Sequence, residues 1–273
     1  MTISEPRKRS AAVAGLFNAL TLALGFVYLG KPRWVVATLL IPFAVLGVFA
    51  WTRVVFVPLG FVAAAVLMLG IWVASIVVAV GMARRQAPAP LAKFQRWYIY
   101  LGYLIVSGIA INAVMEARGR IFGYETFRFP SGSMEDTLQR GDFFLSDTWK
   151  FRDRDPERGE LVVFLYPADP SVKYVKRVIA LPGETVRLDG SEVRVDGKLL
   201  NEPYVNPVNN RGLIPVGSGE FRVPDRSYFV LGDNRDNSSD SRSRGFVPRE
   251  NMHGSVEYVW FSRDLARVGL RVK

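Results

Sequence analysis

The chain has 273 residues, no cysteine, one histidine and a formal net charge of +10. The lack of cysteine excludes disulfides, cysteine nucleophiles and cysteine-ligated metals, and a single histidine excludes a histidine-rich metal site. Many of the basic residues flank apolar runs, so the charge predicts anionic lipid headgroups rather than nucleic acid as its partner. The composition is split between a mostly apolar segment, 11–115, and a charged, turn-rich segment, 116–273.

Four apolar stretches, 11–30, 34–50, 54–82 and 97–115, are candidates to enter a membrane. A helix needs about 20 apolar residues to cross the hydrocarbon core, so the second stretch is short and the third is long enough to tilt. Aromatic residues at the start of the fourth stretch suit a membrane interface. The sequence therefore predicts a multi-span helical membrane region.

Lysine and arginine in short loops predict which side of the membrane each loop occupies, because they favour the cytoplasmic side. The linker 84–96 is basic and is predicted inside, so the fourth stretch carries 116–273 outside.

The basic N-terminus also favours the inside, which three full spans before the linker would not allow. Two alternatives remain. Either 11–30 enters the inner leaflet and returns, or all four stretches span and the N-terminus lies outside. The first is favoured because it leaves only Arg53 outside. The other basic residues concerned are Arg7, Lys8, Arg9, Arg84, Arg85, Lys93 and Arg96.

These features predict four segments. They are an N-terminal membrane module at 1–83, a basic cytoplasmic linker with prolines and alanines at 84–96, a transmembrane anchor at 97–115 and an extracytoplasmic domain at 116–273. We expect a multi-pass protein of the plasma (inner) membrane whose C-terminal domain lies on the extracytoplasmic (periplasmic) side.

From residue 120 onward the apolar residues alternate with a period of two, which is typical of strands. The pairs Asp189-Gly190 and Asp196-Gly197 predict hairpin turns, since glycine accepts a positive φ. No alternation of strands and helices is visible, so a mostly antiparallel β domain is expected. The predicted strands are Thr126–Phe129, Phe143–Leu145, Leu161–Leu165, Tyr174–Ala180, Thr185–Leu188, Glu192–Val195, Tyr228–Leu231 and Val256–Phe261.

Ser133 is a candidate nucleophile in the turn Pro130-Ser131-Gly132-Ser133. A serine hydroxyl reacts only when a base removes its proton, and with one histidine in the chain a lysine is the main alternative base. Ser131 offers a second hydroxyl that could stabilise an oxyanion. A serine-rich turn with no chemical role is the simpler alternative.

Lys176 is the candidate base. Strand alternation places it on the same face as Tyr174 and Val178. Burial on an apolar face disfavours the ammonium and yields a neutral amine that can act as a general base. The alternative is a lysine on an edge strand whose ammonium reaches solvent.

The segment 232–242 is a dense polar loop after a predicted strand. Asp240 and Arg242 could pair there, and Ser238 could bond a lysine amine. A solvated turn is one alternative. A calcium loop is another, but the EF-hand spacing and the closing glutamate are missing. No metal and no cofactor are therefore expected.

Together these segments resemble type I signal peptidase (leader peptidase), a family of Ser-Lys membrane serine proteases. The resemblance covers 124–262, which is most of the β domain and none of the first three apolar stretches. It implies a catalytic domain of signal-peptidase-like coiled β-sheets after the multi-span helical region, whose two or three extra apolar segments exceed the one or two anchors usual in the family. The matching boxes, in the family's order, are Pro130-Ser131-Gly132-Ser133-Met134 with Thr137-Leu138, Gly141-Asp142, 174–184, and 232–242 with 245–248.

By this resemblance Ser133 is the nucleophile and Lys176 its general base. Ser131 and the backbone N–H of Ser133 would form the oxyanion hole, and Ser238 would orient the lysine amine. The residues that would hold the loop are Asp233, Arg235, Asp240 and Arg242. Strands 127–130 and 173–176 would flank an extended substrate. Phe127, Tyr174 and Val175 would help to form small pockets for alanine at substrate positions −1 and −3, and Phe129 and Pro130 are further expected substrate-binding residues.

The implied activity is removal of N-terminal signal peptides from exported precursor proteins through an acyl-enzyme. A peptidase dedicated to one exported substrate and a non-catalytic, membrane-anchored binding module are the alternatives. The chain departs from the family pattern at Asp136, where proline is common, and at Ser243 and Arg244, where aromatic residues are frequent. His253 is expected to be a structural or surface residue.

Overall fold

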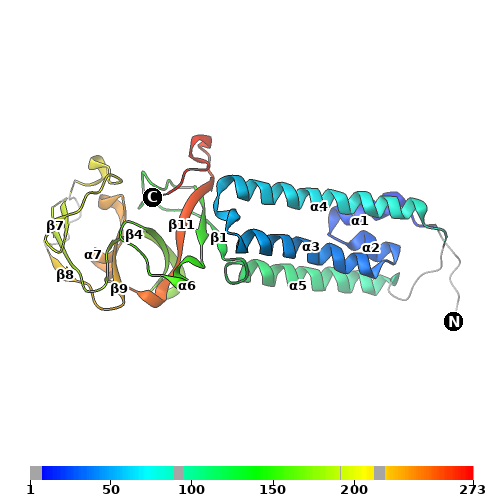
Figure 1. Ribbon diagram of the computed structural model, residues 1–273, viewed down its shortest axis with the longest axis horizontal. Coiled ribbons are helices and arrows are strands. Elements are labelled where there is room, and N and C mark those ends of the chain that lie inside the picture. Colours follow the sequence, from blue (N-terminus) through cyan, green and yellow to red (C-terminus); the bar gives the residue numbers. More distant parts are fainter. Residues whose placement is uncertain (1–7, 89–94, 191, 212–218, 273) are drawn as a thin grey trace. The chain divides into compact units, whose positions relative to one another are not determined.

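The computed structural model describes residues 8–88, 95–190, 192–211 and 219–272. Its contacts divide the chain into two compact units, Met1–Phe122 and Gly123–Lys273. The two units are coloured along the sequence in Figure 1. Two residues of the orientation prediction, Arg7 and Lys93, lie outside the described residues.

Among the described residues, three helices are long and apolar enough to cross a membrane: α3 (Pro32–Trp51), α4 (Pro58–Arg85) and α5 (Trp97–Phe122). They run side by side in Figure 1, and α3 contacts both α4 and α5. A short 3-10 turn, η1 (Val54–Phe56), connects α3 to α4. The predicted anchor 97–115 forms the first part of α5, which continues to Phe122. Large apolar side chains on these helices remain exposed, as contact with lipid requires.

The first apolar stretch is not one helix. It forms α1 (Ala11–Leu20) and α2 (Leu24–Leu29), with Ala23 in the left-handed region at φ 71° between them. The buried amide of Asn18 accepts a hydrogen bond from the N–H of Gly25 at 2.7 Å and donates to a carbonyl of α4. This bond joins the two short helices, so the segment 11–30 folds back on itself as a hairpin.

Both ends of this hairpin lie where α4 ends and α5 begins. The Gln95 side chain donates to the carbonyl of Tyr28 at 2.6 Å and accepts from Arg9 at 3.1 Å. The Gln86 side chain donates to the carbonyl of Leu29 at 3.3 Å. Residues 9, 28–29, 86 and 95 therefore share one end of the helical unit.

The second unit is built from two sheets, and every strand pairing among its described residues is antiparallel. The larger sheet has the order β1-β2-β11-β3-β4-β9-β10 and the smaller one β7-β6-β5-β8. The strands are β1 (Tyr124–Arg128), β2 (Phe143–Asp147), β3 (Leu161–Tyr166), β4 (Asp169–Ala180), β5 (Thr185–Asp189), β6 (Glu192–Val195), β7 (Lys198–Leu199), β8 (Glu220–Arg222), β9 (Ser227–Leu231), β10 (Val247–Pro248) and β11 (Met252–Phe261).

All eight predicted strands are present, and the antiparallel β domain is confirmed. The strands β7, β8 and β10 were not predicted, because two or three residues cannot display an alternating pattern. The predicted hairpin at Asp196-Gly197 connects β6 to β7, with φ values of 49° and 77°. Both residues adopt the left-handed region that a two-residue hairpin turn requires.

Two free strand edges are the feature of the larger sheet that matters for the site. β1 is an edge strand that pairs only with β2. The first part of β4 pairs with β3, whereas its pairing with β9 begins only at Arg177. Residues 172–176 therefore keep one edge without a strand partner. A buried apolar cluster that includes Phe129, Phe144 and Val175 packs beneath these strands.

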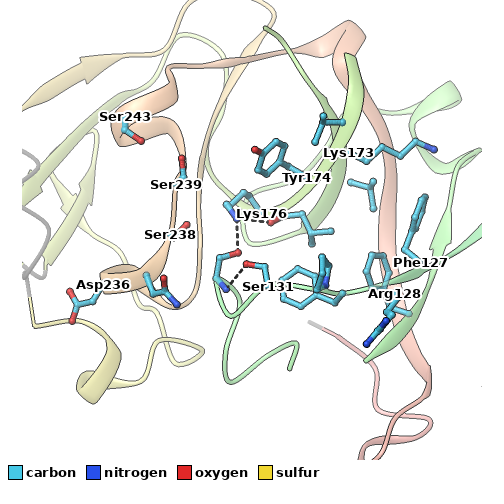
Figure 2. A pocket seen from close by; sticks show the side chains of 18 residues that line it. Phe127, Arg128, Ser131, Lys173, Tyr174, Lys176, Asp236, Ser238, Ser239 and Ser243 are labelled. Carbon is cyan, nitrogen blue, oxygen red and sulfur yellow. Dashed lines mark hydrogen bonds between the residues drawn. The ribbon is translucent and has the colours of Figure 1, made fainter. Parts of the chain in front are cut away.

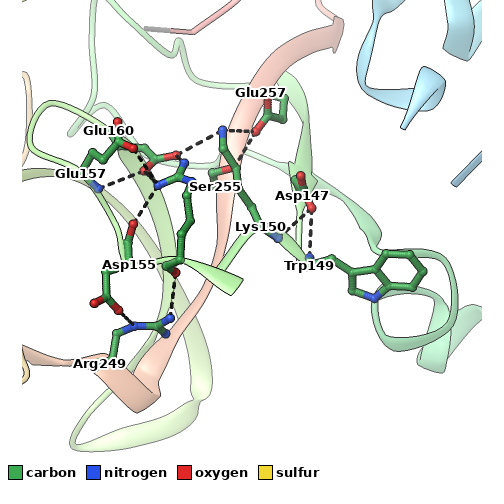
Figure 3. A network of polar contacts seen from close by, with 10 residues as sticks. Asp147, Trp149, Lys150, Asp155, Glu157, Glu160, Arg249, Ser255 and Glu257 are labelled. Atoms are coloured by element: carbon green, nitrogen blue, oxygen red, sulfur yellow. Dashed lines mark hydrogen bonds and ion pairs between the residues drawn. The ribbon is translucent and has the colours of Figure 1, made fainter. Parts of the chain in front are cut away.

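Away from these edges, a polar network fixes the short helix α6 (Lys150–Asp153) to the sheet, as Figure 3 shows. Lys150 Nζ lies 2.7 Å from a carboxylate oxygen of Glu257 on β11 and 3.2 Å from Glu160. Arg154 also pairs with Glu160, at 2.7 Å. Because each charged group in this network has a partner of opposite sign, we interpret it as structural.

Candidate active site

Ser133 and Lys176 meet although 43 residues separate them in the chain. Lys176 Nζ lies 2.8 Å from Ser133 Oγ and also donates to the carbonyl of Val175 at 3.0 Å. Lys176 is 2% exposed and Ser133 is 6% exposed. β4 presents the lysine, while the buried Met134 anchors the turn that carries the serine. The lysine nitrogen is thus within hydrogen-bonding distance of the serine hydroxyl and largely shielded from water.

Burial changes the chemistry of this lysine. It lowers the pKa of Lys176 from its ordinary value near 10.5 to about 8, although the carboxylates of Asp240 and Asp233 oppose the shift and Arg242 adds to it. Desolvation penalises the charged ammonium more than the neutral amine. A substantial fraction of the amine is therefore unprotonated at mildly alkaline pH and can accept a proton.

Ser131 lies beside the same hydroxyl. Its Oγ accepts a hydrogen bond from the backbone N–H of Ser133 at 3.1 Å. Figure 2 shows Ser131 and Lys176 side by side in the cleft. A side-chain hydroxyl and a backbone N–H that are close together can both donate to one developing oxyanion.

Ser238 lines the same cleft, but its hydroxyl is buried and forms no hydrogen bond among the described residues. The expected bond from Ser238 to the lysine amine is therefore absent from this conformation, and the orienting role stays a prediction. Gly232 explains why this loop can approach so closely. A Cβ at Gly232 would lie 2.2 Å from Ser238 Oγ and 2.5 Å from the carbonyl oxygen of Ser133.

Two acidic residues of the polar loop form different structural contacts. Asp240 pairs with Arg242 at 2.8 Å and accepts from the backbone N–H of Gly232 at 3.0 Å. Asp233 pairs instead with Arg177 of β4, through two hydrogen bonds of 2.8 and 2.6 Å. Asp240 therefore closes the loop on itself, and Asp233 ties the loop to the strand that carries Lys176.

The two arginines of the polar loop connect it to a further segment of the chain. Arg242 donates to the carbonyl of Arg235 at 2.7 Å, while the guanidinium of Arg235 pairs with Glu202. The partners Arg177 and Glu202 were not predicted. A signal existed only for Arg177, since consecutive Lys176 and Arg177 in an apolar strand must point to opposite faces and each needs a partner.

Asn234 forms further contacts that the sequence did not predict. Its backbone N–H donates to the carbonyl of Ser133 at 3.1 Å, and its side chain donates to the carbonyl of Gly132 at 3.0 Å. The polar loop thus holds the serine turn by its backbone. The only indication of this role in the sequence was that Asn234 lies next to Asp233 in the polar loop.

A cleft of about 720 Å³ surrounds Ser133 and Lys176 and runs along the free edges of β1 and β4. All five predicted substrate-binding residues line it: Phe127, Phe129, Pro130, Tyr174 and Val175. Phe144, Val163 and Val172 add apolar walls that were not predicted, because in the sequence they are ordinary strand residues. Its apolar walls suit small uncharged side chains.

The positions that depart from the family pattern have specific contacts. Asp136 accepts a hydrogen bond from Asn206 at 2.7 Å. Ser243 lines the cleft, while the Arg244 guanidinium lies 5.4 Å from the centre of the Tyr166 ring.

The single histidine contacts Phe127, one of the residues that line the cleft. His253 Nε2 is 3.2 Å from a carboxylate oxygen of Glu125, and its ring meets Phe127 edge-on. Among the described residues, no hydrogen bond or ion pair joins His253 to Ser133 or Lys176.

An antiparallel β unit with a buried serine and lysine in contact, following apolar helices of membrane-spanning length, has the features of a membrane-bound serine peptidase. A family model described as "Signal peptidase, peptidase S26" matches residues 101–261. The chain belongs to this family. It is a serine endopeptidase of the type I signal peptidase class, which removes signal peptides from exported precursors.

Two relatives compared by sequence agree with the family match. "Probable signal peptidase I-2" of Synechocystis sp. is 44% identical over 167 residues, covering 59% of this chain and 73% of that protein. "Signal peptidase I" of Pseudomonas fluorescens is 34% identical over 189 residues, covering 52% of this chain and 66% of that protein. A crystal structure of a signal peptidase I from Enterococcus faecalis is 32% identical, with a TM-score of 0.32, and covers 37% of this chain and 97% of that one.

Proposed function

We propose that Ser133 is the nucleophile and Lys176 the general base of this peptidase. The observation that carries the proposal is the 2.8 Å separation of Lys176 Nζ and Ser133 Oγ in a site where burial lowers the pKa of the lysine to about 8. A general base must be within hydrogen-bonding distance of the proton that it removes and have a pKa near the working pH.

In the first step the neutral amine of Lys176 takes the proton of Ser133 as Oγ bonds to the carbonyl carbon of the last signal-peptide residue, at position −1. The tetrahedral oxyanion accepts hydrogen bonds from Ser131 Oγ and the Ser133 N–H. The ammonium of Lys176 then protonates the leaving nitrogen as the C–N bond breaks. In the second step Lys176 deprotonates water, which hydrolyses the acyl ester and restores the serine.

The substrate is an extended segment of an exported precursor, held as an added strand between the free edges of β1 and β4. The apolar walls contributed by Phe127, Phe129 and Val175 favour small side chains such as alanine before the scissile bond. The polar loop closes the other side of the site, where Ser238 would orient the lysine amine after rotation of its hydroxyl.

The helical unit anchors the enzyme in the plasma membrane as a multi-pass protein. The hairpin α1–α2 enters the membrane and returns, while α3, α4 and α5 cross it. The bonds of Gln95 to Arg9 and Tyr28, with that of Gln86 to Leu29, support this topology, because they keep both ends of the hairpin beside Gln86 and Gln95. Three crossings then place the β unit on the periplasmic side with the N-terminus inside.

Cleavage of a precursor with an Ala-x-Ala leader by the detergent-purified full chain tests the catalytic proposal. Wild type should cleave after the second alanine, while Ser133→Ala and Lys176→Ala should each lose at least about 1,000-fold in kcat, since base and nucleophile act as a unit. Lys198→Ala, which removes an exposed lysine of β7, is the matched control and should retain activity.

Survival of cleavage in Lys176→Ala would show that another group is the base. A wild-type protein that binds the precursor without cutting it would support the binding-module alternative. Cleavage of only one exported precursor in cells would identify a dedicated peptidase.

A further inference from the structure

A basic cavity lies in the helical unit, far from the Ser133 site in sequence and separate from its cleft. Its volume is about 390 Å³, and it opens between the start of α1 and the end of α4. Three cationic residues line it, Lys8, Arg9 and Arg84, together with the small residues Ser10, Ala11 and Ala83.

No acidic partner of these cations is present among the described residues 8–88 and 95–115. Residues 6–115 contain no aspartate and no glutamate, although they include ten lysines and arginines. Glu5, which precedes this range, lies outside the described residues. Clustered positive charges repel one another unless a counter-charge is nearby. Residues 8–88 and 95–115 supply none, so a bound anion at the cavity would balance these charges.

Arg9 is held in place at the cavity wall. Its Nη2 donates to Gln95 at 3.1 Å, and its guanidinium lies 5.7 Å from the centre of the Tyr28 ring. Its Nε is buried yet has no hydrogen-bond acceptor among the described residues. A buried donor without an acceptor is unfavourable, so a ligand oxygen that accepts from this Nε would be stabilised here in addition to any charge attraction.

We infer that this cavity binds the phosphate of an anionic phospholipid headgroup. Arginine and lysine are the side chains that recognise phosphate oxygens. The inference rests on the proposed membrane topology, in which this end of the unit lies at the cytoplasmic surface, where anionic lipids concentrate basic segments. A lipid is favoured over free phosphate because the α4 face near the cavity exposes apolar side chains that acyl chains can cover.

The two sources of phosphate can be separated by direct binding to the full chain in a neutral detergent. Native mass spectrometry or calorimetry would measure binding of short-chain phosphatidylglycerol, short-chain phosphatidylcholine and inorganic phosphate. The test variant is Lys8→Gln with Arg84→Gln. The control is Arg53→Gln, which removes one cation from the opposite end of α4, about 40 Å away at 1.5 Å per residue.

We expect phosphatidylglycerol to bind wild type and Arg53→Gln with equal affinity. The double variant should bind about 30-fold more weakly, since each basic residue near an anionic surface contributes about 1 kcal/mol. Phosphatidylcholine and inorganic phosphate should bind far more weakly to all three. Equal losses in the control, or no loss in the double variant, would overturn the assignment. Tight binding of inorganic phosphate alone would reassign the cavity to free phosphate.

Precursor cleavage by the same preparations keeps this inference separate from the proposed mechanism. The cavity residues contact neither Ser133 nor Lys176, so the double variant should retain cleavage in detergent. Loss of lipid binding with cleavage intact supports the inference, whereas failure of wild type to cleave would count against the catalytic proposal only.

Discussion

At the scale of single residues, Lys176 reduces the stability of the fold. Its pKa is lowered by burial to about 8, against an ordinary value near 10.5. Below pH 8 both the folded and the unfolded chain hold the proton, and the cost of burying the ammonium, about 3 kcal/mol, is fully present. Between pH 8 and 10.5 the unfolded chain binds more protons, so this contribution makes the free energy of unfolding rise with pH.

Lys176→Met should therefore stabilise the protein while abolishing cleavage. Methionine keeps the volume of the side chain and removes the buried charge. We expect the free energy of unfolding at pH 7 to rise by about 1–3 kcal/mol, with the gain shrinking as pH approaches 10. Denaturant unfolding in detergent at pH 7 and pH 9.5 measures the free energy of unfolding, with Lys198→Met at an exposed position as the control. A variant less stable than wild type at pH 7 would contradict the prediction.

The pair Arg177–Asp233 is the second prediction at this scale. Both side chains are 1% exposed, and Arg177 also donates to the carbonyl of Gly159 at 2.6 Å. Removing one member leaves the other charge buried without its partner, which typically costs about 3–5 kcal/mol. Asp233→Asn should lower the free energy of unfolding by that amount. It should also lower kcat, because Asp233 ties the polar loop to the strand of Lys176.

An exposed pair supplies the matched control. Arg194 and Glu192 are 3.1 Å apart but 41% and 53% exposed. Because water screens such a pair, Glu192→Gln should cost less than about 1 kcal/mol. Equal effects of the two substitutions on stability would mean that Asp233 is not a structural partner of Arg177.

At the scale of elements, an ion pair connects the two strands that border the cleft. Lys173 Nζ on β4 lies 2.7 Å from a carboxylate oxygen of Glu125 on β1 and 4.9 Å from the centre of the Phe127 ring. Burial raises the pKa of Glu125, but the neighbouring His253 and Lys173 outweigh it and lower the pKa to about 2. The carboxylate is therefore charged at any working pH and sets the separation of the two edges.

Glu125→Gln should loosen this connection without touching the reacting groups. We expect KM for a precursor to rise by about three- to fivefold with kcat nearly unchanged, since a partly exposed pair contributes at most about 1 kcal/mol. Steady-state kinetics separates the two constants, and Glu220→Gln on the exposed face of β8 is the control. A fall in kcat at constant KM would show that Glu125 acts on the catalytic groups instead.

Helices and strands could be predicted from the sequence where a pattern of apolar residues extends over several neighbouring positions. Longer strands such as β3 carry a run of apolar residues that can be recognised in the sequence, whereas β8 has only three residues. The break between α1 and α2 was not predicted as a helix boundary. It depends on the bond from Gly25 to Asn18, and no glycine or proline stands at residues 21–23 to mark it. Short elements and tertiary turns thus escape a method that depends on periodicity.

The residues of the site also divide into those that the sequence predicted and those that only the structure reveals. Ser133 and Lys176 each stand in a recognisable box, and the structure places their side chains 2.8 Å apart. The Arg235–Glu202 pair joins segments 33 residues apart, and Glu202 has no distinctive neighbours in the sequence. Contacts between distant segments depend on the assembled fold, so residues such as Glu202 become visible only in the structure.

At the scale of the whole molecule, the side of the membrane on which the N-terminus lies is the open question with the clearest test. The absence of cysteine allows single-cysteine variants in an otherwise native chain. Ser10→Cys and Ala87→Cys mark the two ends proposed to be cytoplasmic. Thr52→Cys marks the turn between α3 and α4, and Ser171→Cys marks the β unit. All four positions are exposed.

A membrane-impermeant maleimide added to intact cells should label Thr52→Cys and Ser171→Cys but neither Ser10→Cys nor Ala87→Cys. All four should react after the membrane is opened. The reason is the parity of the crossings: a hairpin that returns adds none, so three helices separate the N-terminus from the β unit. Labelling of Ser10→Cys in intact cells would mean that 11–30 spans the membrane. Lys8 and Arg84, which line the basic cavity, would then lie on opposite sides of the membrane, and the lipid assignment would fail with the topology.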